Sequence, residues 1–448
     1  MTLRPPAAGV ARHLRITPTN VRTTKWTDWI STLQGRDEKR IARDTARSHA
    51  GRTRHHFSMT CHVLSASDGT DSIRRPMTPA WSAILAGSLA IGVWLEARAE
   101  PGPTKMNRGV IPIRGLHLGV PAKKDLGAAL EFIREVLPKE GVNTLMLEFD
   151  YNYDFRSRTE FADPSAPDKE DVQQIVKACR AAGIELIPQI NCLGHQSWAK
   201  HNGRLLDKHP EFDETPGKFP GNEGIYCRSY CPLHPEVHRV LFDLIDELAG
   251  ACEAKSFHVG MDEVFILADP DCPRCHGKTA AVLFAGEVNT LHAHLKETGR
   301  RMWMWGDRFL DGKSTGLGKW EASENGTHSA VDLVPRDIVI CDWHYDQAAE
   351  TPRFFANKAF EVVVCPWRKT EVALAELAHI RTIRAQVDPN VARRALGVVQ
   401  TTWCGLAPFV KAYKGQASEA ASEKNSASDS ARCFVSLFKA LREEQEVR

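Results

Sequence analysis

The sequence predicts an α/β fold, a single (β/α)8 TIM barrel, and two observations carry this prediction. From about residue 111 onward, short apolar runs alternate with longer segments of helical period, which is typical of repeated β-α units around a parallel sheet. Eight such runs occur, and eight parallel strands close naturally into a barrel. The predicted strands begin at Ile113, Asn143, Ile184, Ser256, Arg301, Asp337, Glu361 and Leu396.

The segments between the predicted strands have the apolar period of helices that pack on a sheet. In the first segment, five apolar residues recur at three- and four-residue steps and form one face: Leu126, Leu130, Ile133, Val136 and Leu137. Further helices are expected over residues 172–182, 235–251, 280–298 and 371–386. Three helices are followed by a glycine, which accepts the left-handed conformation that ends a helix: Gly141, Gly183 and Gly299.

Composition places the chain among ordinary globular proteins. It has 448 residues, of which 42% are hydrophobic and 25% charged, enough for a sizeable core. A net charge of +2 and a pI near 8.0 give no general case for a nucleic-acid partner. No cofactor is indicated, and the sequence leaves the oligomeric state open.

The first hundred residues are expected to lie outside the barrel, which we assign to residues 100–448. Residues 77–99 look like a signal peptide, because basic residues precede an apolar run that ends in the small-x-small site Ala97-Arg98-Ala99. The run is short for a membrane span, so we expect an exported protein, periplasmic or extracellular, without stable membrane insertion. Residues 1–76 are then a mis-assigned upstream extension or a disordered tail.

The 12 cysteines do not form the dense framework of a small secreted domain. Two close pairs stand out, Cys227 with Cys231 and Cys272 with Cys275. These four cysteines are compatible with structural zinc or with disulfides between loops. Residues 272–276 also match the pattern of c-type haem attachment, but that pattern is short and occurs by chance.

Several predicted strands end in polar or aromatic residues, where barrel enzymes carry their functional groups. These ends include Arg114, His117, Glu148, Asp150, His195, Asp262, Glu263, Trp305, Asp307, residues 342–346, Trp367 and Trp403. The longest connections, residues 150–168 and 191–232, follow predicted strands as well. Tryptophans at these ends would offer flat faces to a sugar ring, although Trp303, Trp305 and Trp343 are equally compatible with a place in the core.

The most informative stretch is residues 258–265, where Asp262 and Glu263 follow an apolar run. Successive side chains on a regular strand point to opposite faces, so both carboxylates can serve one ligand only if the strand gives way to loop between them. A carboxylate pair at such a place suggests acid/base chemistry on a sugar.

From about Arg114 to Gly405 the sequence resembles the family 20 glycoside hydrolases, the β-N-acetylhexosaminidases. Residues 258–263 are similar to the family motif His-x-Gly-Gly-Asp-Glu, with Met261 in place of the second glycine. Residues 187–195 resemble a third-strand segment of the family that ends in Gly-His. Arg114-Gly115 resembles its first-strand arginine, and Trp305-Gly306-Asp307 its fifth-strand Trp-x-Asp.

The resemblance implies a retaining exo-β-N-acetylhexosaminidase that releases terminal β-linked N-acetylglucosamine or N-acetylgalactosamine from N-acetylated glycans. In that family the substrate's own acetamido oxygen attacks the anomeric carbon and forms an oxazolinium intermediate. Glu263 would be the general acid and base, and Asp262 would hold the acetamido N–H. The residues expected to bind substrate are Arg114, His195, Trp305, Asp307, Trp343, Tyr345 and Trp403. No metal is implied.

Two departures from the family pattern leave the choice between gluco and galacto sugars open. The family has Tyr-x-Asp on its seventh strand, where this chain has Cys365-Pro366-Trp367-Arg368; Tyr345 and Asp346 are possible substitutes. On the eighth strand, Trp403-Cys404-Gly405 lacks the glutamate that often binds the 4- or 6-hydroxyl.

Two other functions remain open from the sequence. One is a metal-dependent barrel hydrolase, with the ligands His117, His195, His258, Asp307 and His344. The other is a barrel that binds glycans without cleaving them.

Overall fold

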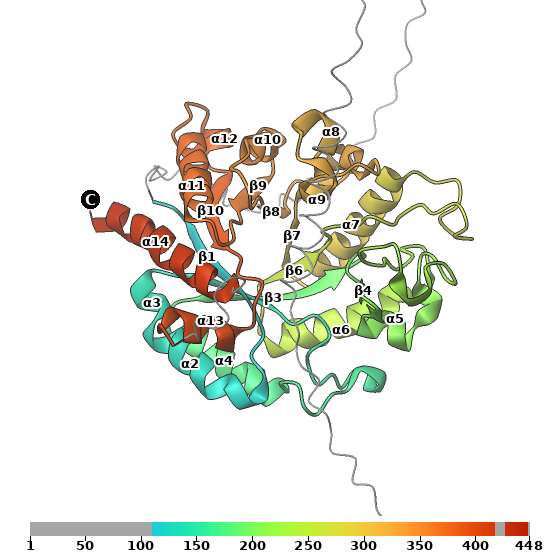
Figure 1. Ribbon diagram of the computed structural model, residues 1–448, viewed down its shortest axis with the longest axis horizontal. Coiled ribbons are helices and arrows are strands. Elements are labelled where there is room, and N and C mark those ends of the chain that lie inside the picture. Colours follow the sequence, from blue (N-terminus) through green and yellow to red (C-terminus); the bar gives the residue numbers. More distant parts are fainter. Residues whose placement is uncertain (1–109, 417–425, 447–448) are drawn as a thin grey trace, which may run out of the picture. The chain divides into compact units, whose positions relative to one another are not determined.

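The computed structural model describes residues 110–416 and 426–446 of the chain. Eight parallel strands form a closed barrel in the order β1-β10-β9-β8-β7-β6-β3-β2 (Figure 1). Their bounds are β1 (Ile113–Gly119), β2 (Thr144–Glu148), β3 (Glu185–Cys192), β6 (Ser256–Gly260), β7 (Arg301–Trp305), β8 (Val339–Asp342), β9 (Glu361–Val364) and β10 (Ala395–Gln400). Every strand begins within two residues of its predicted start, so the (β/α)8 prediction is confirmed. The predicted signal peptide, residues 77–99, and the predicted extension before it lie outside the described residues.

Helices surround the strands (Figure 1). The longer ones are α2 (Leu126–Glu135), α4 (Lys169–Ala181), α6 (Val237–Ala251), α7 (Ala280–Glu297), α10 (Thr351–Asn357), α11 (Thr370–Arg384), α13 (Leu406–Tyr413) and α14 (Ser426–Glu446). Shorter ones are α3 (Leu137–Glu140), α5 (Arg204–Lys208), α8 (Gly312–Thr315), α9 (Gly318–Glu321) and α12 (Pro389–Ala392). A small antiparallel pair, β4 (Ser197–Trp198) and β5 (His201–Asn202), lies in the connection after β3. Among the described residues, no helix is long and apolar enough to cross a membrane.

Local sequence signals account for several helix ends. Helix α4 begins with a capping box, in which the Asp168 side chain accepts the Asp171 N–H and the Asp171 side chain accepts the Asp168 N–H. The glycines predicted to end three helices all adopt positive φ, at 82° for Gly141, 67° for Gly183 and 74° for Gly299. These turns bring the chain from each helix back to the next strand.

The barrel interior holds its own apolar cluster, separate from the larger core between strands and helices. It contains Met146, Ile187, Trp303, Trp305, Val339, Cys341, Trp343, Val363, Cys365 and Val399. Trp303 and Trp305 lie two positions apart on β7 and both point inward, as strand alternation requires. Trp305 has no exposed surface, so our expectation that it contacts substrate is wrong: it fills the barrel beneath the site.

Arg114 lies near the amino-terminal end of β1, at the opposite end of the parallel barrel from the loops that follow the strands. Its Nε donates to the Gly141 carbonyl and its Nη1 to the Ile111 carbonyl, both at 2.8 Å. The guanidinium therefore links β1 to the turn after α3. Our expectation that Arg114 binds ring hydroxyls is wrong, because the residue stands too early in the strand to reach the loop end.

Candidate active site

The carboxylate pair lies where β6 gives way to loop. Gly260, Met261 and Glu263 have positive φ values of 69°, 75° and 48°, so the backbone leaves the extended conformation at the end of the strand. A Cβ on Gly260 would lie 2.2 Å from Asn191 Oδ1, which restricts that turn to glycine. The irregular backbone lets Asp262 and Glu263 serve one site.

His195 joins the two carboxylates. Its Nε2 is 3.2 Å from Asp262 Oδ2 and 3.1 Å from Glu263 Oε2. The preceding Gly194 permits this approach, since a Cβ there would lie 2.7 Å from the Asp262 carbonyl oxygen. Burial alone would lower the pKa of His195, but the negative charge of Asp262 and hydrogen bonds to both carboxylates raise this pKa well above its usual value. A protonated imidazole would thus link the two carboxyl groups.

Asp307 holds the main chain of Glu263 rather than facing a ligand. Its Oδ2 accepts the Glu263 N–H at 2.9 Å and the Arg308 Nε at 2.7 Å. Arg308 in turn donates to main-chain carbonyls within residues 319–322. Asp307 is 1% exposed and positions Glu263 in this structure; direct binding of substrate by Asp307 stays a prediction. Burial raises the pKa of Asp307 to about 6, although Arg308 acts against this rise.

Four half-buried aromatic residues stand beside Glu263, and the sequence analysis missed them. The Tyr226 ring contacts Trp198, Phe265 and Trp320, with centroid distances of 5.4, 5.7 and 5.1 Å. Tyr226 also hydrogen-bonds the Glu263 side chain, and burial raises its pKa well above the usual value. A neutral phenol therefore donates to Glu263. Tyr226 lies in the long connection after β3. The length of that connection was the one sequence signal that marked this segment.

A second aromatic group consists of Trp343, Tyr345 and Trp403, three further residues expected to bind substrate. Trp403 Nε1 donates to Tyr345 Oη at 2.7 Å, and the Tyr345 ring lies 4.9 Å from that of Trp343. Tyr345 and Trp403 are half-buried, whereas Trp343 is 6% exposed. The charge of Asp262 acts on Tyr345, so this group lies near the carboxylate pair.

Two further carboxylates join the cluster from the end of β2. Asp150 Oδ1 accepts the Asn191 N–H at 3.0 Å, and Glu148 Oε1 accepts from Asn191 Nδ2 at 3.3 Å. Burial raises the pKa of Asp150 to about 6 and that of Glu148 well above its usual value, and the charge of Asp262 adds to both shifts. Perturbed carboxyl groups concentrated at one end of a barrel are typical of a catalytic site.

Comparison with known proteins identifies the family that the chain resembles. The model of the glycosyl hydrolase family 20 catalytic domain matches residues 162–377, which include His195, Asp262, Glu263 and Asp307. Over these residues, just under half of its length, the chain resembles the catalytic domain of glycoside hydrolase family 20.

The relatives that this chain matches are distant in sequence. A β-hexosaminidase of Vibrio furnissii is 24% identical over 253 residues, which are 55% of this chain and 34% of that protein. A lacto-N-biosidase of Bifidobacterium bifidum is 28% identical over 165 residues, 34% of this chain and 14% of that protein. The chain thus spans about a third or less of the length of these relatives. A solved structure of a β-N-acetylhexosaminidase shares the fold with a TM-score of 0.52 at 14% identity, covering 75% of this chain and 76% of that one.

Of the four histidines considered as metal ligands, only His195 lies at the carboxylate pair. His117 and His258 are fully buried against Trp305, at centroid distances of 5.7 and 4.5 Å, and burial lowers both of their pKa values. His344 instead contacts Glu321 and Thr351. Within the described part of the chain, only His195 is grouped with Asp262 and Glu263.

Proposed function

We propose that this protein is a retaining exo-β-N-acetylhexosaminidase, which hydrolyses terminal β-linked N-acetylglucosamine or N-acetylgalactosamine by substrate-assisted catalysis. The observation that carries the proposal is the single imidazole of His195 within 3.2 Å of Asp262 and 3.1 Å of Glu263 at the loop end of the barrel. Their closest oxygens lie within 4.8 Å of one another. This spacing suits a division of labour in which the two carboxyl groups act on different atoms of one sugar.

In the first step, Glu263 gives its proton to the glycosidic oxygen as the bond from that oxygen to the anomeric carbon breaks. The acetamido carbonyl oxygen of the sugar forms the new bond to the anomeric carbon and closes an oxazolinium ring. In the second step, Glu263 takes a proton from water, whose oxygen attacks the anomeric carbon and reopens the ring to the acetamide. Tyr226, as a donor to Glu263, supports its ionised form between the two steps.

Asp262 is suited to the positive charge that this route creates. Its Oδ2 contacts His195, while its buried Oδ1 has no hydrogen-bond partner among the described residues. A buried acceptor left without a donor costs about 1–3 kcal/mol. The acetamido N–H of a bound sugar would supply that donor after a small rotation of the side chain, and the carboxylate would stabilise the oxazolinium charge.

A series of aryl glycosides with mono-, di- and trifluorinated N-acetyl groups tests the proposal. Fluorine withdraws electrons from the carbonyl oxygen, so kcat should fall steeply along the series if that oxygen is the nucleophile. A kcat that stays constant along the series would show that the attacking group belongs to the enzyme or to water, and would refute substrate assistance.

A further inference from the structure

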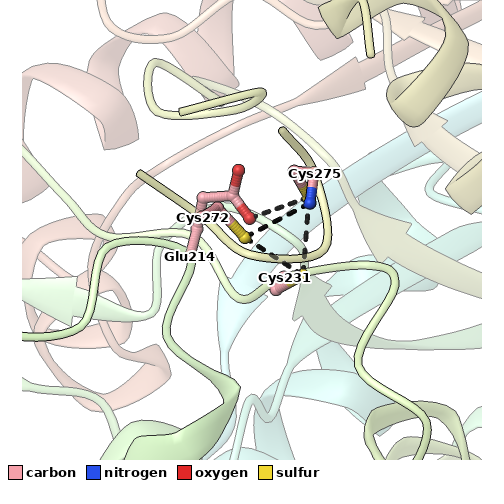
Figure 2. A group of neighbouring side chains, drawn as sticks. All are labelled: Glu214, Cys231, Cys272 and Cys275. Atoms are coloured by element: carbon pink, nitrogen blue, oxygen red, sulfur yellow. Dashed lines mark hydrogen bonds between the residues drawn. The ribbon is translucent and has the colours of Figure 1, made fainter. Parts of the chain in front are cut away.

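A second group of buried ionisable side chains lies away from the catalytic pair. It consists of Glu214, Cys231, Cys272 and Cys275, all with 1% or less of their surface exposed. Figure 2 shows the four side chains turned toward a common centre. We propose that these four residues bind a structural zinc ion, a site that goes beyond the hydrolase function.

The distances within the group fit a tetrahedral shell. Cys231 Sγ lies 3.4 Å from Cys275 Sγ and 3.7 Å from Cys272 Sγ, and Cys275 Sγ lies 3.0 Å from Glu214 Oε2. Zinc binds thiolate at about 2.3 Å and carboxylate at about 2.0–2.2 Å, so tetrahedral geometry gives about 3.8 Å between sulfurs and about 3.5 Å between sulfur and oxygen. The four ligand atoms lie within 4.8 Å of one another, so the group needs only a slight adjustment to surround the ion.

The charge of the group also calls for a cation. The Glu214 carboxyl group is fully buried, and within the described residues Glu214 forms no ion pair. The nearby cations are used elsewhere: Lys218 pairs with Asp269 and Arg228 with Asp213. A buried carboxylate among thiols is costly unless a positive ion joins them, and a divalent metal supplies that charge.

Main-chain amides support the same ligands. The Cys275 N–H donates to Cys272 Sγ at 3.4 Å, and the Asp269 N–H donates to Glu214 Oε1 at 3.1 Å. The Leu233 N–H also bonds Cys231. Donors of this kind orient metal ligands and stabilise thiolates. Cys272 and Cys275 thus form a Cys-x-x-Cys turn already shaped for a metal.

The structure corrects the set of residues that the sequence suggested for zinc or disulfides. Cys227 lies outside the group, with its Sγ 3.6 Å from the Glu263 carbonyl oxygen, and Glu214 takes the fourth place. Sulfurs in a disulfide are about 2.05 Å apart, far closer than the 3.4 Å between Cys231 and Cys275. Haem attachment is disfavoured as well, because Cys272 and Cys275 are buried against Cys231 and Glu214.

The position of the site suggests what the ion does. Glu214 and Cys231 flank the loop that carries Tyr226, while the two remaining cysteines end the loop that begins with Asp262 and Glu263. With four protein ligands the shell is closed, which is typical of structural rather than catalytic zinc. The ion would therefore fasten the two loops to each other and keep Tyr226 against Glu263.

Metal analysis of the full chain tests this proposal independently of any enzymatic activity. After expression with zinc and exhaustive dialysis, elemental analysis should find one zinc ion per chain. Cys231→Ser, Cys272→Ser and Cys275→Ser should each lose it. Cys252→Ser, which changes a buried cysteine outside the group, should keep it.

Cobalt substitution provides a second readout that does not depend on variants folding. Co²⁺ in the wild-type chain should give the visible absorption of a tetrahedral site and a strong thiolate charge-transfer band. A chain that holds no metal, a metal content unaffected by the triple serine variant, or a disulfide between Cys231 and Cys275 found by mass spectrometry of the native protein would overturn the proposal.

Discussion

The catalytic end and the cysteine site both bury carboxylates, and the two sites solve the same electrostatic problem differently. At the catalytic end, His195 and Arg308 compensate Asp262, Glu263 and Asp307. At the cysteine site no protein cation accompanies Glu214 among the described residues. The catalytic end also leaves acceptors without partners, Asp262 Oδ1 and Asp307 Oδ1, whereas the Glu214 carboxyl has contacts at both oxygens. The first arrangement suits a group that changes its charge during turnover, and the second suits a permanent ion.

At the catalytic end, Glu263→Gln is expected to have the largest effect on kcat. Loss of the general acid should lower kcat by about 10²–10⁴-fold. The loss should be greater for an alkyl glycoside than for a nitrophenyl glycoside, because a good leaving group needs less protonation. Glu223→Gln, an exposed glutamate in the loop that carries Tyr226, is the matched control. Equal losses on both substrates would contradict the acid role of Glu263.

A smaller effect is expected from Tyr226→Phe, which removes the hydroxyl that bonds Glu263 but keeps the aromatic ring. Hydrogen bonds to charged groups contribute about 1.5–3 kcal/mol, so kcat should fall by about tenfold or more. Tyr413→Phe removes a hydroxyl that bonds Glu140 at 2.6 Å outside the site, and kcat should not change. If both variants keep full kcat, Tyr226 does not act on Glu263.

Asp150→Asn should make the fold more stable at neutral pH. The folded pKa of Asp150, about 6, lies above its ordinary value of 3.8, so stability falls as pH rises through this interval. Removing the charge should raise the free energy of unfolding at pH 7 by on the order of 1–3 kcal/mol, and the gain should vanish near pH 4.

Asp163→Asn is the control for Asp150→Asn, because it is expected to change stability at neutral pH in the opposite direction. Hydrogen bonds from Ser165 lower the pKa of Asp163 despite partial burial, so its charge stabilises the fold at neutral pH and that contribution is lost as pH falls. This variant should therefore be less stable than wild type at pH 7. Denaturant unfolding of both variants from pH 4 to 7 measures whether each substitution raises or lowers the free energy of unfolding relative to wild type. A loss of stability in Asp150→Asn at pH 7 would contradict the predicted effect of its buried charge.

The smallest effect on catalysis is expected from Arg114→Ala. The side chain bonds two carbonyls at the amino-terminal end of the barrel, so the variant should lose about 1–2 kcal/mol of stability with kcat/KM unchanged. A combined thermal-unfolding and kinetic assay separates these quantities. A large rise in KM without destabilisation would restore Arg114 to the substrate site.

The sequence predicted what depends on local pattern. Apolar runs located every barrel strand, and the break after Gly260 fitted the demand that Asp262 and Glu263 serve one ligand. Prediction from the sequence failed where burial or long-range packing decides the position of a side chain. Trp305 has the residue type of a sugar-binding surface but points into the barrel. Tyr226 bonds Glu263 from the long connection after β3.

The cysteine group shows the same limit. Spacing in the sequence identified the pair Cys272 and Cys275. The fourth residue of the proposed zinc site is Glu214, which is distant from this pair in the sequence and is marked by no local pattern. The prediction that Arg114 binds substrate failed for a different reason. Resemblance to a motif does not determine at which end of a strand a side chain lies.

The most direct test of the central claim compares hydrolysis of an aryl N-acetyl-β-glucosaminide with that of the matching β-glucoside by the full chain, alongside Glu263→Gln. The account predicts turnover of the acetamido substrate alone, lost in the variant. Absence of turnover for both substrates, with binding of N-acetylglucosamine retained, would contradict it and favour a barrel that binds glycans without cleaving them.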